Sequence, residues 1–274
     1  MASAPPPDMA RFRRPAGITG VELVSVAYRE RSFPEHSHAE YVVGAVVAGA
    51  ETLTVAGGTH RIGTGSSLLL NPEQPHRNAT VGDEVLRYHV LYLSEEAVHR
   101  FHDPSAGAPP PRFDTPASAD PAIFDAIVAA HALLGDASAD PLAQESALSL
   151  LLRTLARSGG DARRSATDPA VQKEAVIVAK EYIDAHYAAA FGLADLAGMA
   201  GLSIFHFNRR FRKVVGLSPL AYRNQRRLDE ARRRLLEGEA IAHVAVEVGY
   251  ADQSHLTRHF QRLVGASPGR YAEQ

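Results

Sequence analysis

Hydrophobic and polar residues alternate in short runs over the first part of the chain, from residue 21 to about residue 113. Residues 21–26 and 52–55 alternate one by one, as do strands with a single buried face. Residues 67–70 and 85–93 form more continuous apolar runs. Short strands separated by Gly, Pro and Asn at roughly ten-residue spacing predict an antiparallel β-barrel, with residues 18–113 as its approximate extent.

After a proline-rich break at residues 108–111, the hydrophobic period lengthens to that of a helix. Residues 121–134 place apolar side chains on one face behind a predicted cap at Asp120, and residues 142–155 carry a leucine stripe. We expect this helical pair, within residues 114–157, to cover the barrel, to mediate dimerisation, or both. Residues 158–170 are rich in Gly, Ser, Asp and Arg without periodicity, which predicts a linker.

Helical periodicity resumes at about residue 171, and the last part of the chain contains one pattern twice, at residues 193–222 and 241–271. The offset grows from 48 to 49 residues just after a matched glycine, which indicates one extra residue in the second copy. A short helix, a tight turn at glycine and a second helix are typical of the helix-turn-helix. Leu193, Leu196, Gly201, Phe207, Arg209, Phe211, Gly216, Ser218, Pro219 and Tyr222 recur as Ile241, Val244, Gly249, Leu256, Arg258, Phe260, Gly265, Ser267, Pro268 and Tyr271.

Both copies carry clear helix-start signals for the helix after the turn. Ser203 is the predicted cap in the first copy and Asp252 in the second. Ser218 followed by Pro219 begins another helix that runs to about Leu236, which is about 27 Å at 1.5 Å per residue. A spacer of that length can hold two recognition helices about one DNA turn, ~34 Å, apart.

Charge distinguishes the two parts of the chain, although the total is only −2. Residues 171–274 hold 15 Lys and Arg against 11 Asp and Glu, a net +4, and the rest holds 14 against 20, a net −6. Residues 203–234 hold ten basic side chains and two acidic ones. This stripe predicts a polyanionic partner for the second part. A helical bundle with a solvated basic face is the alternative, which the repeat disfavours.

Other features exclude several classes of protein. The chain has no cysteine, so neither disulfides nor a cysteine zinc site can form. Residues 1–17 are rich in Ala and Pro without an apolar core, which predicts a disordered tail rather than a signal peptide. The longest apolar run, residues 42–50, is too short for a membrane helix. We therefore expect a cytoplasmic protein without a membrane partner.

The repeated part resembles the AraC/XylS family of transcriptional regulators over about 100 residues. The resemblance rests on Leu193-Ala-Asp-Leu196-Ala, Gly201-Leu-Ser203, Phe207-Asn-Arg209-Arg-Phe211, Gly216-Leu-Ser-Pro219, Val248-Gly249-Tyr250, Gln253-Ser-His-Leu256-Thr-Arg258-His-Phe260 and Gly265-Ala-Ser-Pro268. It implies promoter DNA, a small-molecule effector and RNA polymerase as partners, a homodimer, and no enzymatic activity.

The resemblance also implies which side chains face the DNA. Asn and Arg make bidentate contacts to adenine and guanine edges, and Arg209 and Arg258 occupy equivalent positions in the two copies. Because the basic stripe surrounds the first copy, we expect that copy to dominate affinity. The candidate base contacts are Phe205, Asn208, Arg209, Gln253, His255 and Arg258, and the candidate backbone contacts are Ser203, Arg212, Arg223, Arg226 and Arg227.

The barrel part resembles the cupin-type effector domain that commonly precedes such a reader. His36, His38 and His76 stand beside predicted strands, as in cupin metal sites, but the positions expected for a glutamate ligand hold Val42 and Val43. We expect an effector pocket rather than a metal site, with a divalent metal on the three histidines as the alternative. The candidate effector pocket comprises His36, His38, Glu40, Tyr41 and His76.

These observations predict a sequence-specific transcription regulator that is controlled by a small-molecule effector and reads two successive major-groove segments. A metal-dependent cupin oxygenase or isomerase fused to a DNA-binding domain is the alternative, which the missing glutamate disfavours. An architectural DNA-binding protein without a sensor would leave the acidic first part unexplained.

Overall fold

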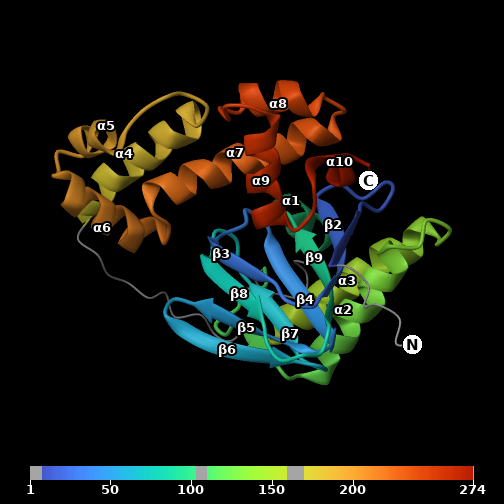
Figure 1. Cartoon of the computed structure of the whole chain (residues 1–274). Helices are drawn as coiled ribbons and strands as arrows, with labels where there is room; N and C mark the ends of the chain where they lie inside the picture. Colours follow the sequence, from blue (N-terminus) through green and yellow to red (C-terminus); the bar gives the residue numbers. More distant parts are fainter. Residues whose placement is uncertain (1–7, 103–109, 159–169, 274) are drawn as a thin grey trace. The chain divides into compact units, whose positions relative to one another are not determined.

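The computed structural model describes residues 8–102, 110–158 and 170–273. The chain folds into two compact units, with the boundary between residues 163 and 164. The first is built from strands followed by helices, and the second from helices (Figure 1).

Two antiparallel sheets form the body of the first unit. One sheet has the strand order β1-β2-β9-β4-β7-β10 and the other β3-β8-β5-β6. The strands are β1 (Met9–Arg13), β2 (Val21–Tyr28), β3 (Ser32–His36), β4 (Tyr41–Ala48), β5 (Ala50–Val55), β6 (Gly58–Gly63), β7 (Ser67–Leu70), β8 (His76–Thr80), β9 (Leu86–Leu93) and β10 (Ala117–Ser118).

Two apolar clusters stabilise this unit, one on each face of the six-stranded sheet. The inner cluster joins the two sheets and includes Val42, Leu53 and Val90. The outer cluster joins Val43 and other outward residues of the sheet to α1 (Glu95–Phe101), α2 (Pro121–Leu134) and α3 (Pro141–Ser158). Since neighbouring strand residues point to opposite faces, one strand supplies both clusters. The antiparallel barrel and the helical pair are therefore confirmed.

The prediction of a disordered tail over residues 1–17 is wrong for the part that the structure describes. Residues 9–13 form β1, which pairs with β2 from Met9 opposite Ala27 to Arg13 opposite Leu23. Ala10 is buried there. The strand is short and lies at the edge of its sheet, so it buries few apolar side chains and its sequence shows no alternating hydrophobic pattern. Strand β10, paired with β7, likewise extends the sheet into the region expected to hold only the helical pair. Residues 1–7 lie outside the described part.

The second unit consists of α4 (Ala170–His186), α5 (Leu193–Met199), α6 (Ile204–Val215), α7 (Pro219–Leu236), α8 (Ile241–Glu247), α9 (Gln253–Val264) and α10 (Pro268–Ala272). Phe207 and Phe211 of α6, and Leu256 and Phe260 of α9, are fully buried. The two copies of the repeat thus fold around equivalent apolar anchors. No described helix of the chain has the length and apolarity needed to cross a membrane.

The predicted caps are confirmed. The Ser203 side chain accepts a hydrogen bond from the His206 amide, Ser218 from the Ala221 amide and Asp252 from the His255 amide. These acceptors satisfy amides that have no partner within a helix, so they determine where each helix begins. The long helix from Pro219 to Leu236 follows directly from the Ser218 cap and the Pro at its first position.

Candidate functional site

The outward face of α6 carries the candidate base contacts of the first copy. Asn208, Arg209 and Arg212 are exposed, whereas Phe207 and Phe211 point into the core. The helix begins after the exposed cap Ser203, so Asn208 and Arg209 lie within two turns of its N-terminus and Arg212 lies in the third turn. The side chain of Phe205 lies outside the described residues. The structure thus gathers the described first-copy candidates on one exposed surface.

The second copy presents a related but less basic face on α9. Gln253 and Arg258 are exposed, and Arg258 stands six positions after its cap, as Arg209 does after Ser203. His255 is only half-exposed, because its ring contacts Tyr250 edge-on with centroids 5.1 Å apart and His259 with centroids 5.5 Å apart. We therefore expect His255 to be held more rigidly than the other candidates of this helix.

The arginines of α7 depart from the expectation of phosphate contacts. Arg223 donates to the Phe191 carbonyl at 3.1 Å, and its guanidinium lies 4.9 Å from the centre of the Phe191 ring. Arg226 forms ion pairs with Asp184 of α4 at 3.0 Å and with Asp229 at 3.5 Å. Both side chains are half-buried, so their charges are largely used in holding α7 against α4, through Arg226, and against the segment after α4, through Arg223.

Arg227 departs furthest from the expected phosphate contact, because the residue is only 8% exposed. Its Nε donates to the Tyr187 carbonyl at 2.7 Å, just beyond the end of α4. The carbonyls at a helix C-terminus have no partner within the helix and carry partial negative charge, which a guanidinium satisfies. The prediction that Arg227 contacts DNA phosphate is therefore wrong, since a charge count along the sequence cannot separate solvent-facing arginines from buried ones.

In the first unit, His36, His38 and His76 come together at one end of the space between the two sheets. One nitrogen from each ring lies within 4.8 Å of the others. His36 pairs with His76 across β3 and β8, and the two ring centres are 4.2 Å apart. The prediction that these three histidines converge is confirmed by this geometry.

Hydrogen bonds determine the tautomers of the two buried rings. The Nδ1 of His36 lies 2.7 Å from the Pro34 carbonyl, and the Nδ1 of His76 lies 3.0 Å from the Gln74 carbonyl. A carbonyl only accepts, so each Nδ1 carries the proton and each Nε2 keeps a lone pair. Burial lowers the pKa of His36, and burial together with the His36 charge lowers the pKa of His76 to about 3. Both rings are neutral at pH 7.

Neutral imidazole nitrogens are suitable ligands for a divalent transition ion. A tetrahedral site with bonds of 2.0–2.1 Å places its nitrogens about 3.4 Å apart, which is compatible with three nitrogens that all lie within 4.8 Å of one another. Glu40 does not belong to this cluster among the described residues. The donor set therefore fits a metal ion with three protein ligands, all of them histidines.

Tyr41 does not line the same space. Its ring packs with Phe113 at a centroid distance of 6.1 Å, within the outer cluster that faces the helices. Val42, the next residue, points to the inner cluster instead. The assignment of Tyr41 to a pocket with the histidines is therefore wrong. The reason is strand parity, since β4 begins at Tyr41 and the residue's face is set only by that register.

Sequence reasoning missed an acidic group inside the barrel. Glu51 is 1% exposed, and its Oε2 accepts a hydrogen bond from Asn78 Nδ2 at 2.8 Å. Its other oxygen has no hydrogen-bond partner among the described residues. Burial raises the pKa of Glu51 to about 7. The sequence pattern could have indicated this position, because Glu51 alternates with Leu53 and Val55, which are both buried on the inner side of β5.

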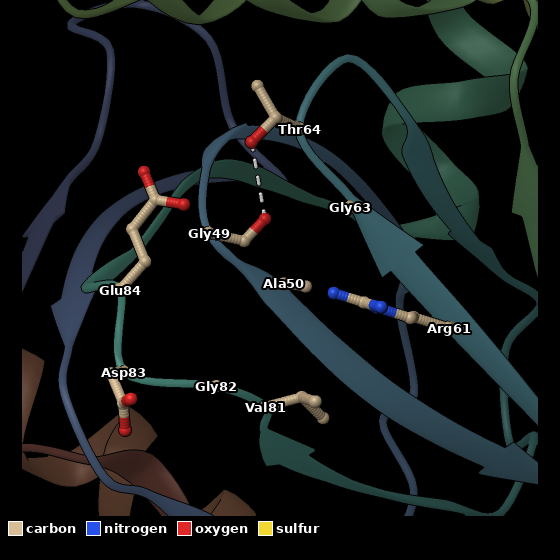
Figure 2. A pocket seen from close by; sticks show the side chains of 9 residues that line it. All are labelled: Gly49, Ala50, Arg61, Gly63, Thr64, Val81, Gly82, Asp83 and Glu84. Carbon is tan, nitrogen blue, oxygen red and sulfur yellow. Dashed lines mark hydrogen bonds between the residues drawn. The ribbon is translucent and has the colours of Figure 1, made fainter.

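A pocket lies at the other end of β5. Gly49, Ala50 and Arg61 line it with Gly82 and Glu84, and Thr64 Oγ1 donates to the Gly49 carbonyl at 3.2 Å (Figure 2). Since Val55 pairs with His76 and Glu51 pairs with Thr80, this pocket and the histidines lie at opposite ends of the strand. None of the five candidate effector residues lines it.

Comparison with known proteins agrees with both units. Residues 19–152 match the AraC-like ligand binding domain, and residues 196–274 match a helix-turn-helix domain. The uncharacterized HTH-type transcriptional regulator YbfI of Bacillus subtilis is 27% identical over 227 residues, 82% of each chain. The HTH-type transcriptional regulator ExsA of Pseudomonas aeruginosa is 31% identical over 90 residues, and the match spans about a third of its length.

Among solved structures, ToxT of Vibrio cholerae shares the fold. The structure of its unsaturated fatty acid-bound form has a TM-score of 0.59 and 13% identity, covering 95% of this chain and 96% of that one. At this identity the likeness concerns the fold alone. The matched domain pair, the relatives and the repeated capped helices together show that this chain belongs to the AraC family of transcriptional regulators, with a ligand-binding domain and a helix-turn-helix DNA-binding domain.

Proposed function

We propose that this regulator binds two successive major-groove segments of promoter DNA, with α6 in one and α9 in the other. The observation that carries this proposal is the occurrence of two capped helices with buried aromatic anchors and exposed polar faces in one unit. Such a helix presents its N-terminal residues to base edges in the groove. The 18-residue helix α7 separates the two copies.

Specific roles follow from exposure and side-chain chemistry. Asn208, Arg209, Gln253, His255 and Arg258 read base edges, because these side chains lie on the outward faces of α6 and α9. Ser203 and Arg212 contact the phosphate backbone and orient the first copy. Arg223 and Arg226 contribute long-range positive charge at most, since they are engaged with α4 and its following loop.

In the first unit, the space between the sheets receives a small-molecule effector. His36, His38 and His76 offer ring nitrogens there that can form hydrogen bonds, and Glu51 adds a buried carboxyl further along β5. Effector binding shifts the equilibrium between states that differ in DNA affinity, which requires unequal effector affinity for those states. We further propose that α2 and α3 mediate homodimerisation, that RNA polymerase is the regulated partner, and that the protein acts in the cytoplasm.

We propose a sensor rather than an enzyme for the barrel. The three histidines favour the second candidate, a metal-dependent cupin activity, because they could hold an ion that polarises a bound substrate. Metal analysis of protein purified without chelators separates the two. A stoichiometric content of iron, manganese or zinc that is lost in His76→Gln would favour the enzyme.

The proposal of two-segment DNA binding can be tested by letting the full chain select duplexes from a pool of random DNA sequences. We expect the selected sequences to share two short motifs with centres about 10 base pairs apart, one for each helix. Selection of a single motif, or of no motif at moderate salt, would contradict the two-segment reading.

A further inference from the structure

Three separate segments of the second unit meet at one point. They are the turn after α4 (residues 187–189), the middle of α7 at Arg227, and Gly249 in the turn between α8 and α9. The first segment directly follows α4, which packs against the first helix-turn-helix in one apolar cluster, and the third segment belongs to the second helix-turn-helix. We refer to this meeting point of Arg227, Gly249 and residues 187–189 as the joint.

Arg227 forms the centre of the joint. Besides the bond to Tyr187, its Nη2 donates to the Ala188 carbonyl at 3.4 Å and to the Ala189 carbonyl at 3.5 Å. A planar guanidinium can serve several acceptors at once, which a lysine ammonium on a flexible stem cannot do with the same geometry. Arg227 thus holds α7 to the end of α4 at a defined angle.

Gly249 brings the second helix-turn-helix to the same point. Its φ is +87°, and a Cβ at this position would lie 2.5 Å from the Ala188 carbonyl oxygen and 2.7 Å from Arg227 Nη2. The equivalent glycine of the first copy, Gly201, also has a positive φ, but a Cβ there would meet nothing within 4 Å. The turn explains glycine in both copies, whereas Gly249 also permits a close approach of the second motif to Ala188 and Arg227.

Tyr250 connects the joint to the recognition helix of the second copy. Its buried ring lies 5.9 Å from the Arg227 guanidinium carbon and contacts His255 in the first turn of α9. The contacts therefore run without a break from the end of α4, through Arg227 and Tyr250, to α9. We propose that Arg227 and Gly249 fix the spacing and angle between α6 and α9, which makes simultaneous binding of two DNA segments cooperative and selective for their spacing.

The functional arm of this inference rests on the proposed two-segment DNA binding. Linked sites gain affinity only when their geometry permits simultaneous engagement. We expect Arg227→Gln to weaken binding to the selected duplex about tenfold, and to change binding to a duplex with one motif scrambled by less than about twofold. We also expect the variant to tolerate a one-base-pair insertion between the motifs better than the native chain.

Matched variants separate the joint from general destabilisation. Gly249→Ala should reproduce the loss of spacing selectivity, whereas Gly201→Ala imposes similar backbone strain in open space and should keep it. Arg227→Lys retains the charge and should lie between the native chain and Arg227→Gln. Arg233→Gln, on the exposed side of α7, controls for the loss of one positive charge. Equal weakening on paired and scrambled duplexes would overturn the inference.

A distance measurement tests the joint without DNA. Because the chain has no native cysteine, Lys213→Cys on α6 and Gln261→Cys on α9 allow selective spin labelling. We expect one narrow distance distribution in the native background and a broader or shifted one with Arg227→Gln or Gly249→Ala, at unchanged helix content by circular dichroism. An unchanged distribution would refute the joint. If the native chain selects no DNA, the proposed function fails while this measurement still decides the joint.

Discussion

The buried carboxyl of Glu51 provides a quantitative test of the barrel interior. Burial raises the pKa of Glu51 in the folded protein to about 7, from its ordinary value of 4.5. Such a group contributes its full stability below the unfolded-state pKa, and this contribution is lost as the pH rises through the folded-state pKa. Between pH 5 and pH 7 the Glu51 carboxyl is mostly ionised in the unfolded chain, whereas in the folded protein it mostly keeps its proton. Each full pH unit in this range costs up to about 1.4 kcal/mol. Because Glu51 is already half ionised in the fold at pH 7 and still partly protonated in the unfolded chain at pH 5, the whole interval costs about 2 kcal/mol of folding stability.

Glu51→Gln removes the titration and keeps the shape. The amide oxygen of the new side chain can still accept the hydrogen bond from Asn78 Nδ2. The difference in stability between variant and native chain should therefore shift by about 2 kcal/mol in favour of the variant from pH 5 to pH 7, and level off above about pH 8. Other titrating groups are common to both proteins and cancel in this difference.

Hydrogen exchange of peptides from β5 and β8, corrected for the intrinsic rate at each pH, measures opening of this unit alone. Glu84→Gln, an exposed position in the same unit, is the matched control and should show no such trend. A difference between Glu51→Gln and the native chain that stays constant from pH 5 to pH 8 would show that the carboxyl ionises normally in the fold.

Three further predictions concern the two candidate sites. Arg209→Ala and Arg258→Ala should each reduce affinity for the selected duplex by about 1–3 kcal/mol and relax base preference in different motifs, as measured by fluorescence anisotropy; unchanged affinity in both would contradict the base-reading assignment. Asp252→Ala removes the cap of α9 and should cost about 1 kcal/mol in urea unfolding, with binding to the second motif weakened more than to the first; equal weakening of both motifs would argue against separate readers. Protein purified without chelators should contain substoichiometric metal by mass spectrometry, and a full equivalent would instead support the metal-dependent alternative.

Local patterns account for most of the fold that could be predicted. The helix limits at Pro121, Leu134, Pro219 and Leu236 agree with the structure because caps and prolines act on the residues directly beside them. The strands with clear alternation are also present. By contrast, β1 and β10 are edge strands whose only stabilising partners are distant in sequence, so the chain shows little local sign of them.

The candidate site was predictable only where its residues belong to repeated or paired patterns. The convergence of His36, His38 and His76 followed from their positions beside strands. The inward position of Glu51 and the outward position of Tyr41 depend on strand register, which a single residue's shift would reverse.

The sequence by itself determined the class of this protein, because a repeat with matched caps, glycines and aromatic anchors specifies two helix-turn-helix motifs through local interactions. It also indicated the basic character of that part. Only the tertiary structure decided how the arginines are used. Arg209 and Arg258 remain on exposed faces, whereas Arg227 is buried against carbonyls about forty positions away along the chain. A guanidinium binds phosphate and helix-end carbonyls by the same chemistry, so its role depends on which acceptor the fold brings within reach.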